Sequence, residues 1–159
     1  MPLLAAHGLT FSAGGQVLHH DLSLELERGE LVGLVGPSGS GKTTLLRCLA
    51  LLQDPDRGQL ALDGQSPGDL GYPSWRRQVA LIGQRPVLFD ASVRDNLARP
   101  FSFATATTSF PEATARAWLE KLGLEASRMK QDATTLSEGQ RQRVSLVRGL
   151  LLEPAVLLL

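Results

Sequence analysis

The hydrophobic pattern in the first half of the chain predicts several strands. Residues 22–27 alternate apolar and polar side chains, and the leucine-rich stretches of residues 3–27 are broken at residues 12–15, which together predict an antiparallel hairpin region. Residues 31–35 are apolar without interruption, so we expect a strand that is buried on both faces in a parallel sheet. Shorter apolar runs predict further strands over residues 59–62, 79–82 and 155–159.

Helical spacing of apolar residues predicts three helices between and after these strands. Residues 42–52 carry one apolar stripe, and a second helix over residues 112–122 lies within an insertion, residues 91–123, that we expect to be mainly helical. A third helix over residues 138–152 follows Ser137, a residue suited to cap it. The apolar stripe of the first helix consists of Leu45, Leu46, Leu49 and Leu52. In the third helix, one apolar face consists of Val144, Val147 and Leu151. The order of strands and helices predicts an α/β fold.

Composition narrows the classes of protein that fit. A chain of 159 residues is the size of one compact domain. Its 16 basic and 16 acidic side chains cancel, so net charge gives no reason to expect nucleic acid as a partner. Cys48 is the only cysteine, which excludes an internal disulfide and fits a cytoplasmic location. The start of the chain lacks the pattern of a signal peptide, and the apolar segment 150–159 is shorter than the roughly 20 residues of a membrane helix.

A glycine-rich loop lies between the predicted strand 31–35 and the helix that follows. Residues 36–43 match the pattern G-x-x-x-x-G-K-[ST] at every fixed position. Glycines let backbone N–H groups face an anion, the helix N-terminus favours negative charge, and Lys42 supplies a cation for the terminal phosphates. The Thr43 hydroxyl suits Mg²⁺, and Thr44 adds a second hydroxyl. The alternative is a glycine-rich turn with a chance lysine. The predicted phosphate-binding residues are Gly36, Pro37, Ser38, Gly39, Ser40, Gly41, Lys42, Thr43 and Thr44.

A second group of motifs narrows the choice among phosphate-loop proteins. Residues 136–140, Leu-Ser-Glu-Gly-Gln, are followed by Arg141-Gln142-Arg143, and Gln84 ends the apolar run 79–83. These motifs, together with residues 86–89 and 92–97, follow one another in the order found in ABC ATPases. The chain therefore resembles an ABC transporter ATP-binding subunit along essentially its whole length. Residues 77–101 resemble bacterial iron-efflux ABC ATPase subunits most.

The resemblance implies a P-loop NTPase fold with a RecA-like core, an N-terminal antiparallel β region and a helical subdomain. The chain would then be one partial nucleotide-binding domain. Residues 1–84 would form the β region and phosphate-loop core, residues 85–152 the mainly helical subdomain, and residues 153–159 the start of the Walker B strand.

The resemblance also assigns roles in binding ATP and Mg²⁺. Phe11 would stack on adenine with Val17 nearby, and Gln84 would reach Mg²⁺ and the attacking water. Ser137, Gly139 and Gln140 would hold the nucleotide of a second subunit in a head-to-tail dimer. Each role has a structural alternative: an aromatic core residue for Phe11, an ordinary strand end for Gln84 and a helix cap for Ser137. Glu138 departs from the glycine that is commonest at its position.

The resemblance implies an ATP-binding subunit that couples ATP binding and hydrolysis to transport by a separate transmembrane permease subunit, on the cytoplasmic face of the membrane. Two other classes compete with it. One is an ABC ATPase of DNA repair or translation, and the other is a non-catalytic nucleotide-binding module. The chain ends where the family places the Walker B Asp and Glu, so we expect a fragment that binds nucleotide weakly and lacks coupled ATPase activity.

The remaining prominent residues have ordinary interpretations. His19 and His20 are adjacent, so on a strand they point to opposite faces, and a solvated strand end is expected. Trp75 and Trp118 are expected to pack in the core. The arginines at positions 141, 143 and 148 are expected to form a solvated helix face.

Overall fold

The computed structural model describes residues 1–103, 106 and 108–159, which form two compact units. The first unit comprises Met1–Leu81 and Ala155–Leu158, and the second comprises Ile82–Pro154 with Leu159. Each unit has its own cluster of buried apolar side chains. Among the described residues, every helix is too short or too polar to cross a membrane.

The first unit contains an antiparallel sheet of three strands. Strands β1 (Leu4–Ala13) and β2 (Gln16–Leu26) form the predicted hairpin, and β3 (Arg57–Leu62) pairs with the other edge of β1, giving the order β2-β1-β3. The turn passes through Gly14 and Gly15, both of which have positive φ angles. The register of the hairpin shifts between Leu9 and Phe11 and again between Phe11 and Ser12, so Phe11 lies opposite His19. These irregularities bend the hairpin near its turn.

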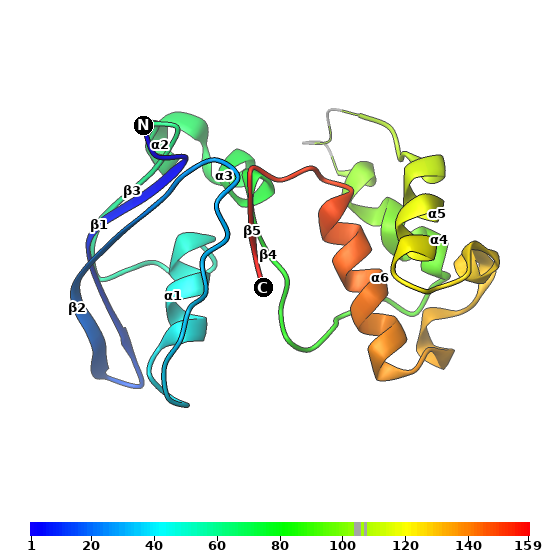
Figure 1. The fold of residues 1–159 in the computed structure, drawn as a ribbon, viewed down its shortest axis with the longest axis horizontal. Helices are drawn as coiled ribbons and strands as arrows, with labels where there is room; N and C mark the ends of the chain where they lie inside the picture. The colour runs from blue at the N-terminus through cyan, green and yellow to red at the C-terminus, as the bar shows by residue number, and fades with distance from the viewer. Residues whose placement is uncertain (104–105, 107) are drawn as a thin grey trace. The chain divides into compact units, whose positions relative to one another are not determined.

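Helix α1 (Lys42–Leu49) packs beside this sheet, as Figure 1 shows. Leu45, Cys48 and Leu49 are its buried residues. The indole N–H of Trp75, from α3 (Tyr72–Gln78), donates to the carbonyl of Leu49 at 2.9 Å, and Trp75 is fully buried as predicted. The short helix α2 (Pro67–Leu70) lies between β3 and α3 in the chain.

The prediction that α1 continues to residue 52 is wrong. The helix ends at Leu49, and Leu51 adopts a positive φ angle of 52°. The N–H groups of Leu52 and Gln53 both donate to the carbonyl of Arg47, which closes the helix in the manner of a left-handed C-terminal cap. Leu52 therefore falls outside the apolar stripe and has 59% of its surface exposed.

A parallel pair of strands completes the first unit. Strand β4 (Val79–Leu81) pairs with β5 (Val156–Leu158), in the register Val79 to Val156. Both strands were predicted. The prediction of a buried strand at residues 31–35 is wrong: these residues form no strand, and Leu31 and Val35 have 98% and 93% of their surface exposed. Among the described residues, β4 and β5 pair only with each other, which leaves residues 31–35 without the neighbouring strands that bury such a run.

The second unit is mainly helical, as the pattern of residues 91–123 and 138–152 predicts. Its α-helices are α4 (Val93–Ala98), α5 (Glu112–Lys121) and α6 (Glu138–Leu150). In the described part of this unit they are accompanied by the 3₁₀ helices η1 (Arg99–Ser102), η2 (Ala126–Lys130) and η3 (Ala133–Thr135). Figure 1 shows α6 beside α4 and α5. The apolar core of this unit includes Val93, Leu97, Leu119, Val144 and Val147.

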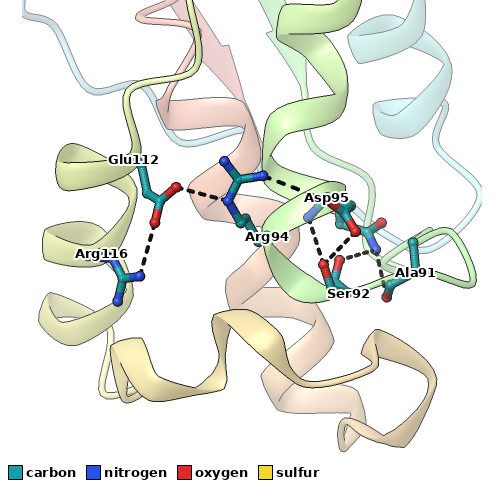
Figure 2. A network of polar contacts seen from close by, with 7 residues as sticks. Ala91, Ser92, Arg94, Asp95, Glu112 and Arg116 are labelled. Atoms are coloured by element: carbon teal, nitrogen blue, oxygen red, sulfur yellow. Dashed lines mark hydrogen bonds and ion pairs between the residues drawn. The ribbon is translucent and has the colours of Figure 1, made fainter.

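Polar contacts fix α4 to the loop before it and to α5. Figure 2 shows Arg94 reaching Glu112, whose carboxylate also accepts a hydrogen bond from Arg116; the two distances are 2.8 and 3.0 Å. The hydrogen bonds from Arg116 and then Arg94 lower the pKa of Glu112. Ser92 caps α4 by accepting a hydrogen bond from the Asp95 N–H at 3.1 Å.

Candidate functional site

The loop of residues 36–41 needs glycine at two positions and is crowded at a third. Gly39 and Gly41 have φ angles of +80° and +86°, which side-chain-bearing residues rarely adopt. A Cβ atom at Gly36 would lie 3.0 Å from the Ser40 hydroxyl oxygen. A turn closes the loop, because the Ser40 N–H donates to the Pro37 carbonyl at 3.3 Å. The sequence pattern of the phosphate loop therefore corresponds to real backbone constraints.

Lys42 folds back over this loop. Its ammonium donates to the carbonyls of Gly36 and Pro37, both at 2.7 Å. An ammonium has three N–H donors, so one remains for a ligand held in the loop. The positive charge thus sits on the loop that is predicted to bind phosphate.

The start of α1 adds further groups that suit an anion. Its first N–H groups have no acceptor within the helix, no side chain caps it, and its first turn contains no acidic residue. Thr43 is exposed and Thr44 is half-buried, so the Thr43 hydroxyl is accessible to a hard cation such as Mg²⁺. The donors present fit an anionic phosphate with an oxygen-ligated cation.

Burial of α1 affects the one cysteine of the chain. Cys48 lies on the buried face of the helix, and this desolvation, together with the nearby charges of Asp56 and Asp54, raises the pKa of its thiol. A thiol with a raised pKa is a poor nucleophile and a poor metal ligand at neutral pH. Cys48 therefore serves the packing of α1.

Phe11 lies in the core of the first unit with 0% of its surface exposed. Phe11 is therefore an aromatic core residue, the structural alternative to stacking on adenine, because neither face of its ring is open to a base. Val17, the second residue predicted beside adenine, is 56% exposed. The hairpin thus offers Val17, but not Phe11, to a ligand.

His19 contacts the phosphate loop, which sequence reasoning missed. Its Nε2 atom lies 2.8 Å from the Ser40 carbonyl oxygen, and its ring centroid lies 5.3 Å from that of Phe11. The expectation of a solvated strand end holds for His20, which is exposed, but not for His19, which is half-buried. The shifted hairpin register places His19 opposite Phe11, and the sequence carried no signal for that shift.

Gln84 is exposed in the second unit, on the segment between β4 and α4. The same segment is held by α6, because Arg148 donates to the Val87 carbonyl at 2.8 Å. Arg148 is half-buried and bonded to the backbone, so the prediction that it belongs to a solvated helix face is wrong; its burial also lowers the pKa of its guanidinium. Arg143 likewise donates to the Gly123 carbonyl at 3.2 Å, and the Nε atom of Arg141 is buried without a hydrogen-bond partner among the described residues.

The motif of residues 136–140 forms the N-terminus of α6 in the second unit. The Ser137 hydroxyl accepts from the Gln140 N–H at 3.3 Å, and the Gln140 side-chain oxygen accepts from the Ser137 N–H at 3.0 Å. This reciprocal capping box confirms the predicted helix cap. Ser137, Glu138 and Gly139 are exposed, so their groups are open to a partner.

Comparisons with known proteins identify relatives of the whole chain. The family model described as ABC transporter matches residues 19–159. The chain is 35% identical to a probable iron export ATP-binding protein, FetA, of Escherichia coli, over 99% of this chain and 69% of that protein. It is 36% identical to the methionine import ATP-binding protein MetN 1 of Listeria monocytogenes, over 94% of this chain and 46% of that protein.

A solved structure described as the ATP binding subunit of an ABC transporter shares the fold. It superposes with a TM-score of 0.83 at 28% identity, covering 96% of this chain and 63% of that one. The likeness confirms the predicted P-loop NTPase fold. The chain spans about half the length of the curated relatives that it matches: it covers 46% of the methionine import protein and 46% of the STAR1 protein of Oryza sativa.

Proposed function

Because the chain belongs to the ABC transporter family, we propose that it is the nucleotide-binding part of a transporter's ATP-binding subunit and holds ATP at residues 36–43. The observation that carries this proposal is the phosphate loop itself. Two glycines with positive φ, a folded-back lysine and an uncapped helix N-terminus converge on one short segment. Each favours an anion for an independent physical reason.

Each group of the loop has a part in binding ATP. Lys42 and the backbone N–H groups of residues 38–44 would hold the phosphates, and Val17 offers an exposed apolar surface for the base. The hydroxyl of Thr43 would hold Mg²⁺. When bound, Mg²⁺ neutralises charge on the phosphate oxygens.

The exposed start of α6 supports the proposal of a second copy as partner. Ser137 and Gly139 lie at a helix N-terminus whose internal hydrogen bonds are made by the capping box, so the Gly139 N–H remains for an external anion. In the proposed head-to-tail dimer these residues hold the nucleotide bound at the phosphate loop of the other subunit.

We also propose that the full-length protein is an ATP hydrolase that works with a transmembrane permease subunit on the cytoplasmic face of the membrane. Relatives named as import and export ATP-binding proteins support transport over DNA repair or translation. Purification of the full-length protein with a polytopic membrane protein tests this partner. An ATPase that purifies without any membrane subunit and acts fully alone would contradict it.

Titration with a fluorescent ATP analogue and Mg²⁺ tests the binding site. We expect Lys42→Ala to weaken binding at least about 10-fold, because it removes the charged donor of the loop. Lys130→Ala, which removes the same charge from η2, should bind like the wild type. Equal affinities of wild type and Lys42→Ala would overturn the assignment.

A further inference from the structure

We propose that His19 is a positioning residue for the phosphate loop: by holding the Ser40 carbonyl, it turns the Gly41 N–H towards the bound phosphate. This inference rests on the proposed function of the loop. His19 lies on β2, outside the phosphate-loop motif, and acts on that motif through its backbone.

The contact between β2 and the loop is close at two consecutive residues. His19 Nε2 lies 2.8 Å from the Ser40 carbonyl oxygen. A Cβ atom at Gly41 would lie 3.3 Å from His19 Cδ2 and 3.2 Å from Leu18 Cβ. The Ser40–Gly41 peptide therefore rests directly on the side chains of Leu18 and His19, and only glycine fits there without displacing them.

The hydrogen bond fixes the direction of a neighbouring amide. A peptide group is planar and, when trans, its C=O and N–H point in opposite directions. All peptides of the described residues are trans. Since the Ser40 carbonyl points at His19, the Gly41 N–H of the same peptide points away from β2. The Gly41 N–H is one of the backbone donors of the phosphate loop, so its direction matters for anion binding.

The surroundings of His19 hold its ring in this position. The ring lies 5.3 Å from the buried ring of Phe11, with an angle of 39° between the two planes. Because a carbonyl oxygen only accepts hydrogen bonds, Nε2 must carry the proton. His20, the next residue, is exposed and faces the opposite side of the strand, so it provides a matched control.

Three variants of the full-length protein test the proposal by titration with a fluorescent ATP analogue and Mg²⁺. We expect His19→Leu, which keeps the bulk and removes the donor, to raise the Kd roughly 10-fold. His19→Gln restores an N–H donor and should bind within about threefold of the wild type. His20→Leu should leave the Kd unchanged. An unchanged Kd in His19→Leu, or an equal loss in His20→Leu, would overturn the role of His19.

The protonation of the His19 ring can be measured in the wild-type protein, where no substitution can disturb folding. The ¹⁵N chemical shifts of the His19 ring at pH 8.5 should show the proton on Nε2, and a proton on Nδ1 alone would overturn the proposal.

The Lys42→Ala variant separates the role of His19 from the proposed function of the loop. If the wild type binds and Lys42→Ala does not, the loop is a nucleotide site, and the His19 variants alone decide the inference. If the wild type does not bind at all, the proposed function itself fails.

Discussion

At the residue scale, the glycines of the two motifs are required for different reasons. Gly41 needs its positive φ angle and lies against Leu18 and His19, so the fold itself requires glycine there. Gly139 has no such constraint: a Cβ atom would meet only Arg143 Nη2, at an ordinary contact distance of 3.9 Å. The fold of this chain therefore gives no reason for a glycine at position 139, whereas the proposed partner nucleotide does.

This contrast predicts different results for two alanine substitutions. Gly139→Ala should leave the melting temperature unchanged or higher, because alanine is the better helix former by about 1 kcal/mol. It should bind Mg-ATP normally in a single chain and fail to form the nucleotide-dependent dimer, since the methyl group would hinder the close approach of the partner's phosphate to the N–H of residue 139.

Gly41→Ala should instead lose both stability and nucleotide binding. Thermal unfolding and sedimentation with and without Mg-ATP measure these effects. A Gly139→Ala variant that dimerises like the wild type would argue against a phosphate contact at that residue.

The phosphate-loop residues could be predicted from the sequence because glycine and lysine at fixed spacing determine the loop locally. The positions of the Phe11 and His19 side chains could not be predicted in this way. Their positions depend on the irregular pairing between β1 and β2, where two shifts occur within four residues. A shift of one residue reverses which face a side chain occupies, so alternation along one strand cannot reveal its partner on the other.

At the element scale, helices α5 and α6 follow the sequence closely, whereas α1 ends earlier than predicted and one predicted strand does not form. The apolar stripe of α6 is a local property, and its cap at Ser137 is readable from the Ser-x-x-Gln spacing. Residues 31–35 have the composition of a buried strand, but burial needs neighbouring strands on both sides. Pairing depends on residues far away in the chain, so composition alone could not decide the outcome.

The segment before α4 depends on one buried side chain, Asn96, which is 1% exposed. Its amide oxygen accepts from the Phe89 N–H at 2.8 Å, and its amide nitrogen donates to the carbonyls of Phe89 and Ser92, both at 3.0 Å. This side chain therefore ties the segment that follows Gln84 to α4.

We expect Asn96→Leu to lower the free energy of unfolding by about 1–3 kcal/mol, because it leaves part-buried backbone groups of Phe89 and Ser92 without these partners. Asn96→Asp should cost more, since it turns a second acceptor towards two carbonyl oxygens. Urea denaturation of both variants measures the effect, with the exposed Asp90→Asn as a control. Losses below about 0.5 kcal/mol in both would show that the segment is held by other contacts.

At the scale of the whole molecule, the predicted nucleotide contacts are divided between the two units. The phosphate loop and Val17 belong to the first unit, whereas Gln84 and the start of α6 belong to the second. The sequence predicted both groups of residues, and two arrangements are distinct: Ser137 serves either the nucleotide of its own chain or that of a partner. Only an experiment with two different chains separates the two arrangements.

Mixed dimers of full-length protein make that separation. A Lys42→Ala chain has a damaged phosphate loop and an intact Ser137, and a Ser137→Ala chain has the reverse. If Ser137 acts on the partner's nucleotide, a dimer of the two variants contains one intact site and one that is damaged twice. Neither variant alone contains an intact site in this arrangement. Trapping of labelled nucleotide should therefore be absent in each variant alone and return in the mixture, at one of the two sites of every mixed dimer. If Ser137 served the nucleotide of its own chain, every site in the mixture would carry one substitution, and trapping would stay absent.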